Sequence, residues 1–218
     1  MMNEKTRETF LLWTETEEYK KKVEEAKKII KNALKTHKKP YVAYSGGKDS
    51  TVMLNLILKQ KPDILVFHYD YGRYMPRWLE KEVITNAKKI GVQNFLVDSG
   101  KNWYKTFFGR IEKDFERKGY DLVFVGIRKE ESCKRKARIE EKHFLSKMDE
   151  CWPLKNWTWK DVWGYIVKNK LPYPSVYDKY AELLGYDKVR FVTFFDPEFE
   201  KFGGPILDGF IIWKEKNR

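Results

Sequence analysis

The feature that most constrains this 218-residue chain is the stretch formed by residues 41–51. A short apolar run there leads into the pair Gly46-Gly47, and the chain then continues in a pattern typical of a helix. Glycine has no Cβ, so this pair can adopt positive φ and bring backbone N–H groups close to an anion. The helix that begins near Asp49 points its positive dipole end at the same place. The stretch therefore predicts a strand, a phosphate-binding loop and a helix.

Polar side chains add to this loop. Ser45 and Ser50 supply hydroxyl groups, and Lys48 supplies a positive charge directly after the glycine pair. The Walker loop has a different spacing, with four residues between its first glycine and its Gly-Lys pair. The run Ser-Gly-Gly-Lys-Asp-Ser at residues 45–50 instead resembles the PP-loop of the ATP pyrophosphatase (adenine nucleotide alpha hydrolase) superfamily. The alternative is a Gly-Gly turn without a ligand, which the match of six consecutive residues disfavours.

Strand-like and helical patterns alternate along the rest of the chain. Helical periodicity is found at residues 16–36, 52–60, 76–90, 103–118 and 158–169, and short apolar runs at 41–44, 64–69, 95–97 and 122–126. This alternation predicts an α/β fold, a doubly wound and mostly parallel sheet with helices on both faces, plus a helical C-terminal extension. We expect an N-terminal helical segment (1–38), a PP-loop domain (39–150) and a helical, aromatic extension of that domain (151–218).

In such sheets ligands bind outside the carboxyl ends of the strands. Besides the loop, two predicted strands end in residues with binding chemistry, namely Asp70-Tyr71-Gly72 and Gly126-Ile127-Arg128. Arg128 can grip a phosphate or sulfate with its planar guanidinium. Asp70 has three interpretations that stay open: a metal ligand, an acceptor for the nucleotide, or the N-cap of a turn.

Residues 126–138 carry a second signature. Gly126-Ile127-Arg128, followed by Glu131-Ser132 and then Arg135, resembles the corresponding loop of the phosphoadenosine phosphosulfate (PAPS) reductase family, which also contains the small subunit of ATP sulfurylase and the FAD synthetases. Residues 152–178 are similar to a later segment of that family. The resemblance covers roughly residues 40 to 180. Among the cations after Arg128, binding of an anion and a solvated basic helix face stay equally open.

The resemblance implies an Mg-ATP-dependent enzyme that cuts ATP between its α and β phosphates and adenylylates a small anionic acceptor. It implies catalytic roles for Lys48, Asp49 and Arg128, with Asp49 or Asp70 as a ligand of Mg²⁺. The nucleotide site that it implies consists of Ser45, Gly46, Gly47, Lys48, Asp49, Ser50, Asp70, Gly72, Gly126, Arg128, Glu131 and Arg135.

The cysteines depart from the pattern of the reductases. Those enzymes use a C-terminal cysteine, whereas the two cysteines here are Cys133 and Cys151, and none follows. A thiolate is the required nucleophile in that reduction, so PAPS reduction is disfavoured. Binding of a sulfonucleotide without reduction stays an alternative. The cations near Cys133 leave it a candidate reactive thiol, while we expect Cys151 to be structural.

The charge balance leaves the partners open. Lys and Arg number 44 against 32 Asp and Glu, a formal net charge of +12, which attracts anions of every kind, from nucleotides to nucleic acid. Sulfur modification of tRNA or DNA is therefore an alternative function, as is a nucleotide-binding module without turnover. The apolar run at residues 10–13 packs either on the domain or on a second copy in a homodimer. With no apolar run of membrane-spanning length, we expect a cytoplasmic protein.

Overall fold

A five-stranded parallel sheet forms the centre of the computed structural model, which describes residues 2–72, 75–100 and 103–189. The strand order is β3-β2-β1-β4-β5, and every neighbouring pair is parallel. The strands comprise β1 (Pro40–Ala43), β2 (Leu65–Asp70), β3 (Asn94–Ser99), β4 (Leu122–Phe124) and β5 (Asp149–Cys151). The order reverses direction at β1, so the predicted doubly wound α/β fold is confirmed, and the loop after β1 lies where such sheets bind ligands.

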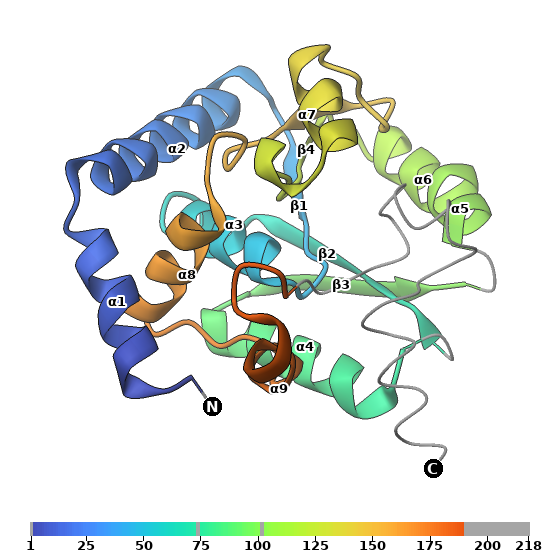
Figure 1. The fold of residues 1–218 in the computed structure, drawn as a ribbon. Helices are drawn as coiled ribbons and strands as arrows, with labels where there is room; N and C mark the ends of the chain where they lie inside the picture. Colours follow the sequence, from blue (N-terminus) through green and yellow to red (C-terminus); the bar gives the residue numbers. More distant parts are fainter. Residues whose placement is uncertain (1, 73–74, 101–102, 190–218) are drawn as a thin grey trace.

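Helices lie on both sides of this sheet. In Figure 1, α4 lies below β3, while α5 and α6 lie above it. The helical elements are α1 (Glu4–Thr14), α2 (Glu17–Thr36), α3 (Lys48–Leu58), α4 (Arg77–Ile90), α5 (Trp103–Thr106), the π-helical turn η2 (Phe107–Ile111), α6 (Glu112–Arg117), the 3-10 turn η3 (Lys129–Glu131), α7 (Cys133–Glu140), α8 (Trp159–Lys168) and α9 (Val176–Leu184).

The N-terminal helices pack on this chain. The predicted apolar stripe of α2 is buried, and Thr16 caps the helix by accepting the backbone N–H of Tyr19 at 3.3 Å. In α1, Phe10 is buried and Trp13 donates its indole N–H to Asp161 of α8 at 2.9 Å. Of the two alternatives for residues 10–13, Phe10 and Trp13 therefore match packing on the domain. Leu12, by contrast, is 73% exposed.

The aromatic segment before α9 belongs to the core, as predicted. Trp157 and Trp163 are almost completely buried, and Trp159 is half-buried. The predicted cap of α8 is also present, because Thr158 accepts the backbone N–H of Asp161 while Asp161 accepts that of Thr158. The part of the predicted C-terminal extension at residues 190–218 lies outside the described residues. The division at residues 38 and 150 stays a prediction.

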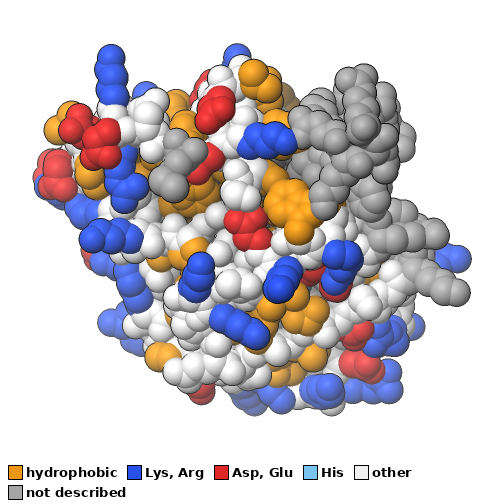
Figure 2. Space-filling model, turned by 90° about the horizontal axis from the view of Figure 1, so that it is seen from below, with side chains coloured by type: hydrophobic (Ala, Val, Ile, Leu, Met, Phe, Trp, Pro, Cys, Tyr) orange, Lys and Arg blue, Asp and Glu red, His pale blue; other side chains and the backbone are white. Residues whose placement is uncertain are grey.

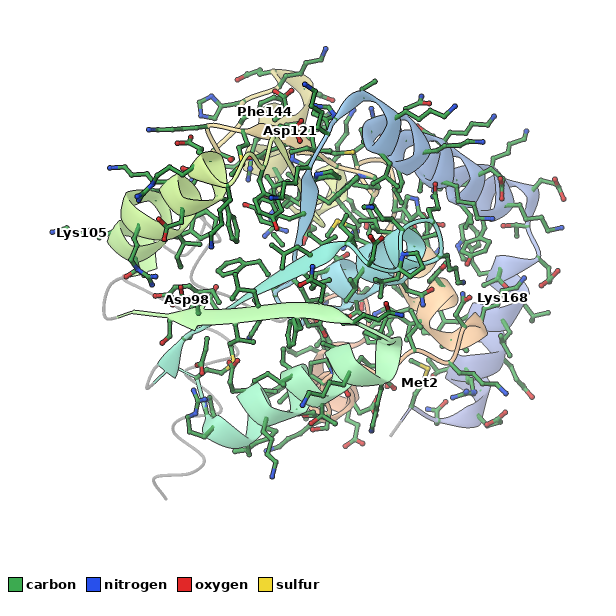
Figure 3. All side chains as sticks on the ribbon, turned by 180° about the vertical axis from the view of Figure 1, so that it is seen from behind. Met2, Asp98, Lys105, Asp121, Phe144 and Lys168 are labelled. Atoms are coloured by element: carbon green, nitrogen blue, oxygen red, sulfur yellow. The ribbon has the colours of Figure 1, made fainter. Side chains whose placement is uncertain are left out.

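The sequence reading missed strand β5. Its residues, Asp149-Glu150-Cys151, lack the apolar run by which we recognised the other strands, yet they pair with β4. Directly before β4, Asp121 accepts the backbone N–H groups of Lys38 and Lys39, which precede β1, at 2.7 and 2.9 Å (Figure 3). This contact fixes where β1 and β4 enter the sheet.

Within the described part of the chain, no helix combines the length and the apolar character needed to cross a membrane.

Candidate active site

The loop between β1 and α3 is shaped by one glycine with positive φ. Gly46 has φ of +83°, and a Cβ at this position would lie 2.5 Å from a methyl carbon of Val83 in α4. Gly47 instead has φ of −71° and forms the N-cap of α3. The positive φ expected for the pair thus occurs at Gly46 alone. The absence of a side chain at Gly46 allows the loop to lie directly on α4.

A second glycine lets the loop after β4 approach the first turn of α3. A Cβ on Gly126 would lie 3.1 Å from both the Cα and the backbone nitrogen of Ser50. The predicted neighbourhood of the two loops is therefore present. It brings the two sequence signatures together at the carboxyl edge of β1 and β4.

The serine hydroxyls of the loop bond within it. The hydroxyl oxygens of Ser45 and Ser50 lie 3.0 Å apart, and Ser50 donates to the carbonyl oxygen of Gly47 at 2.9 Å. Both hydroxyls also line a cavity, which is described below. They therefore hold the loop in shape while remaining at the surface that a ligand would meet.

Lys48, Asp49 and Arg128 form one buried ionic cluster. Arg128 donates its Nε–H to Oδ1 of Asp49, and the Lys48 ammonium lies 3.2 Å from Oδ2 of the same carboxylate. Burial alone would raise the pKa of Asp49, but Arg128 and Lys48 outweigh it and hold that pKa well below its ordinary value. Burial lowers the pKa of Lys48, with Asp49 opposing the change. The three predicted catalytic residues are thus brought together.

Arg128 makes further contacts that fix its position. It is 3% exposed, donates to Glu130 at 2.6 Å and contacts the carbonyl oxygen of Trp157 at 3.4 Å. Glu131 accepts the backbone N–H of Arg128 at 2.9 Å and forms an ion pair with Arg135. Glu131 thereby holds Arg135 beside this turn. In this arrangement Arg128 links the two loops.

Asp70 lies at the end of β2 in a separate ionic pair. Its carboxylate accepts two hydrogen bonds from Arg77, at 2.6 and 2.8 Å, and one from the backbone N–H of Gly72 at 2.7 Å. The hydrogen bonds from Arg77 lower the pKa of Asp70, against a smaller opposing effect of burial. Of the three interpretations of Asp70, the hydrogen bond from Gly72 matches the N-cap of a turn.

The two predicted metal ligands belong to different ionic pairs. Both oxygens of Asp49 face cations, and so do both oxygens of Asp70. Among the residues that the structure describes, no group of three His, Cys, Asp or Glu side chains is placed to hold a metal ion. The donor set therefore does not form a dedicated magnesium site. Mg²⁺ usually retains several waters and binds through substrate phosphates, so it would accompany ATP.

A cavity of about 370 Å³ adjoins the loop. Its lining includes Ser45 and Ser50 of the loop, Tyr41 and Ala43 of β1, and residues of η2 and α7. Its apolar lining is rich in aromatic rings, namely Tyr41, Tyr44, Phe67, Tyr69, Tyr71, Phe107 and Phe108, and its basic residues are Lys134, Arg135 and Arg138. Aromatic walls suit a nucleobase, and the cations suit anionic groups. These residues fit an adenine nucleotide whose phosphates meet the loop.

Two tyrosines of the site were not foreseen. Tyr41 lines the cavity with a buried hydroxyl that has no hydrogen-bond partner among the described residues. Tyr177 of α9 accepts the backbone N–H of Lys48 at 3.0 Å. Tyr41 looks like an ordinary strand residue in the sequence, and Tyr177 is 129 positions from Lys48. No local pattern in the sequence therefore indicates the role of either tyrosine.

Fold and site together define an α/β protein with a glycine-rich loop at the carboxyl edge of a parallel sheet. Residues 39–189 match the phosphoadenosine phosphosulfate reductase domain, which is more than half of the chain. The chain belongs to this family, as its two signatures predicted, and its fold is that of the adenine nucleotide alpha hydrolases.

Relatives in sequence include proteins with a stated activity. An uncharacterised protein of Methanocaldococcus jannaschii is 33% identical over 184 residues, covering 74% of this chain and 37% of that protein. Sulfate adenylyltransferase subunit 2 of Rhizobium meliloti is 25% identical over 198 residues, covering 70% of this chain and 65% of that subunit. The chain therefore spans less than two thirds of the length of both relatives.

Solved structures agree on the fold. The FMN adenylyltransferase of Candida glabrata, in complex with FAD and inorganic pyrophosphate, has a TM-score of 0.57 at 16% identity and covers 73% of this chain and 59% of that chain. The PAPS reductase of Candida auris, in complex with phosphate, has a TM-score of 0.52 at 16% identity and covers 82% and 93%. At these identities the likeness concerns the fold alone.

Proposed function

We propose that the protein is an Mg-ATP-dependent enzyme that cleaves ATP between its α and β phosphates, transfers the adenylyl group to a small anionic acceptor and releases pyrophosphate. The observation that carries the proposal is the PP-loop beside the cavity, with Lys48, Asp49 and Arg128 joined in one buried ionic cluster. The names of two relatives, sulfate adenylyltransferase subunit 2 and FMN adenylyltransferase, support the reaction class.

In the proposed reaction an acceptor oxygen attacks the α phosphorus. The bond from that phosphorus to the oxygen bridging to the β phosphate breaks, and pyrophosphate leaves with the electron pair. Such a transfer needs positioning and charge stabilisation more than covalent help from the protein. The first backbone amides of α3 and the hydroxyls of Ser45 and Ser50 hold the leaving phosphates. Lys48 adds positive charge at the same place.

We propose a positioning role for Arg128. It bonds to Asp49, Glu130 and the Trp157 carbonyl oxygen, so in this arrangement it orients the start of α3. Asp49 is likewise held between two cations and keeps Lys48 near the phosphates. Each carboxylate oxygen of Asp49 and Asp70 already contacts a cation, so Mg²⁺ would be held chiefly by the phosphates of ATP.

The acceptor would enter from the basic side of the cavity. Arg135 and Arg138 of α7 line it, and each is paired with a glutamate, Glu131 and Glu150 respectively. Arginines held by glutamates keep a fixed orientation, and the planar fork of a guanidinium matches the geometry of an anion. This side of the cavity therefore favours a small anionic acceptor over a neutral one.

The distribution of charge on one face of the molecule does not favour the nucleic-acid alternative there. On the face seen in Figure 2, Lys and Arg side chains are spread among apolar and acidic groups instead of forming one continuous basic patch. Binding to a phosphate backbone is favoured by a clustered basic surface.

A nucleotide-binding module without turnover is the second candidate. It is favoured by one observation, that the ammonium of Lys48 is buried beside Asp49. In that function the loop would bind ATP and report it to another protein without cleaving it.

Replacement of Lys48 separates the two candidates. We expect Lys48→Ala to abolish pyrophosphate release from Mg-ATP while the protein stays folded by circular dichroism. Lys59→Ala is the control, because Lys59 is an exposed lysine at the C-terminal end of α3 that bonds Tyr165 and Asn169 away from the loop. Unchanged pyrophosphate release in Lys48→Ala would contradict the enzyme proposal. Absence of release from the wild type, with ATP still bound, would favour the binding module.

A further inference from the structure

The phosphate-binding loop has a contact with α9 that the proposed reaction does not use. The hydroxyl oxygen of Tyr177 accepts a hydrogen bond from the backbone N–H of Lys48 at 3.0 Å. The Lys48 ammonium also lies 5.7 Å from the centre of the Tyr177 ring. Tyr177 is 1% exposed, so solvent does not replace it at this amide.

The amide that Tyr177 occupies is one that a phosphate would use. Lys48 is the first residue of α3, and the N–H groups of a first helical turn have no partner inside the helix. The same groups bind phosphates when a glycine-rich loop precedes the helix. A phenol oxygen and a phosphate oxygen therefore compete for one donor. The phosphate makes the stronger bond because it is charged.

Tyr177 is held in place from two sides. Its ring packs edge-on against Trp163 of α8, with ring centroids 5.3 Å apart. At the start of α9, Ser175 donates its backbone N–H and its hydroxyl to the carboxylate of Glu82 in α4, both at 2.9 Å. Gly46 of the loop packs against the same helix α4, so α4 contacts both the loop and the start of α9. These contacts hold the hydroxyl beside the Lys48 amide in the ligand-free protein.

We propose that Tyr177 is a positioning residue of the phosphate site, which occupies the Lys48 amide in the ligand-free protein and regains it as pyrophosphate leaves. It weakens the binding of pyrophosphate and thereby favours product release. The inference rests on the proposed function in one respect, that phosphates bind this loop.

The test compares Tyr177→Phe with the wild type in calorimetric titrations with inorganic pyrophosphate. The phenylalanine keeps the ring against Trp163 and removes only the competing oxygen. A net hydrogen bond between neutral groups corresponds to roughly a two- to tenfold change in affinity, so we expect the variant to bind pyrophosphate about two- to tenfold more tightly. Its ligand-free form should unfold at a lower temperature, because the Lys48 amide is left without a partner.

Tyr173→Phe is the matched control. Tyr173 packs on the same Trp163 and donates its hydroxyl to Asp178. Tyr173→Phe therefore removes a hydroxyl from the same aromatic cluster without changing the loop. It should leave pyrophosphate affinity unchanged. A purely structural role of Tyr177 would lower stability in both variants and change affinity in neither.

Two outcomes overturn the inference: affinity that is unchanged in Tyr177→Phe, or affinity that falls, as it would if the hydroxyl were itself a phosphate ligand. Failure of the proposed function gives a different result. Pyrophosphate would then still bind and Tyr177→Phe would still tighten it, while ATP is not cleaved. Absence of pyrophosphate binding in both proteins would contradict both proposals.

Discussion

Arg128, in the loop after β4, is bonded to Asp49 in the first turn of α3, although 79 residues separate them in the chain. This ion pair joins the PP-loop segment (residues 45–50) to the second family signature (residues 126–138). It also neutralises a carboxylate that would otherwise repel the phosphates of a nucleotide. The site is therefore held together by the same charges that define its chemistry.

Loss of this pair should destabilise the fold. Asp49→Asn leaves the buried Lys48 without its paired carboxylate and leaves Arg128 with Glu130 alone, and breaking a buried pair from one side costs about 3–5 kcal/mol. Urea unfolding measures the change. Asp98→Asn is the control, because Asp98 on β3 pairs with Arg110 near the surface (Figure 3) and should contribute less than about 1 kcal/mol. Equal losses in the two variants would show that the Asp49 pair is not effectively buried.

Gly46 should tolerate no side chain. Gly46→Ala places a Cβ 2.5 Å from Val83 and also forces alanine into a left-handed conformation. Gly119→Ala has a similar φ of +80° and no atom within 4 Å, so it measures the backbone effect alone, about 1–2 kcal/mol. We expect Gly46→Ala to cost about 1–3 kcal/mol more than this control in urea unfolding, and to weaken ATP binding.

Val83→Ala should partly rescue Gly46→Ala, since it removes the two methyl groups nearest to the new Cβ. If Gly46→Ala and Gly119→Ala lower the free energy of unfolding equally, close packing of the loop on α4 is not what requires glycine at position 46.

Stability should decline in acid. The pKa values of Asp49 and Asp70 are both held below the ordinary value in the folded protein. An unfolded Asp has a pKa of about 3.9, so below that pH the unfolded state binds more protons and is favoured. The contribution of both pairs is complete above about pH 5 and is lost as the pH falls through 3.9 towards the lower folded pKa values.

Urea unfolding between pH 7 and pH 3 tests this expectation. The free energy of unfolding should fall below about pH 4 in the wild type and fall less steeply in Asp70→Asn. Identical slopes would mean that the Arg77 pair does not lower the pKa of Asp70.

The two cysteines should differ in reactivity. Burial raises the pKa of the Cys151 thiol to about 12, so it stays protonated at pH 8 and does not act as a nucleophile. Cys133 is exposed at the start of α7. A thiol reagent such as DTNB should therefore modify one cysteine rapidly in the folded protein and both in denaturant. Rapid modification of both in the native protein would contradict the buried position of Cys151.

Local patterns in the sequence predicted the sheet, the loop and most helices, because each rests on the periodicity or chemistry of a few adjacent residues. Strand β5 was missed because Asp149 and Glu150 are charged and the strand is recognised only by its pairing with β4. Glu150 is placed there because Arg138 and the indole N–H of Trp152 both donate to it. Such compensation depends on tertiary contacts.

The sequence predicted which residues gather at the site better than it predicted their contacts. The sequence suggested Arg128 as a grip for an anion, whereas in the folded chain its guanidinium contacts Asp49 and Glu130. It gave no sign of Tyr177, since a hydroxyl in one helix reaches the amide of another only through the packing of α8 and α9. The partners of a charged or polar side chain are decided by the fold.

The most direct test of the proposed function is a product analysis with Mg-ATP. The purified protein is incubated with Mg-ATP and, separately, with sulfate, FMN, sulfonucleotides or bulk RNA, and AMP, pyrophosphate, ADP and phosphate are quantified. We predict that pyrophosphate and an adenylylated product rise together with one small anionic acceptor and not with RNA. Formation of ADP and phosphate, or ATP binding without any product, would contradict cleavage between the α and β phosphates.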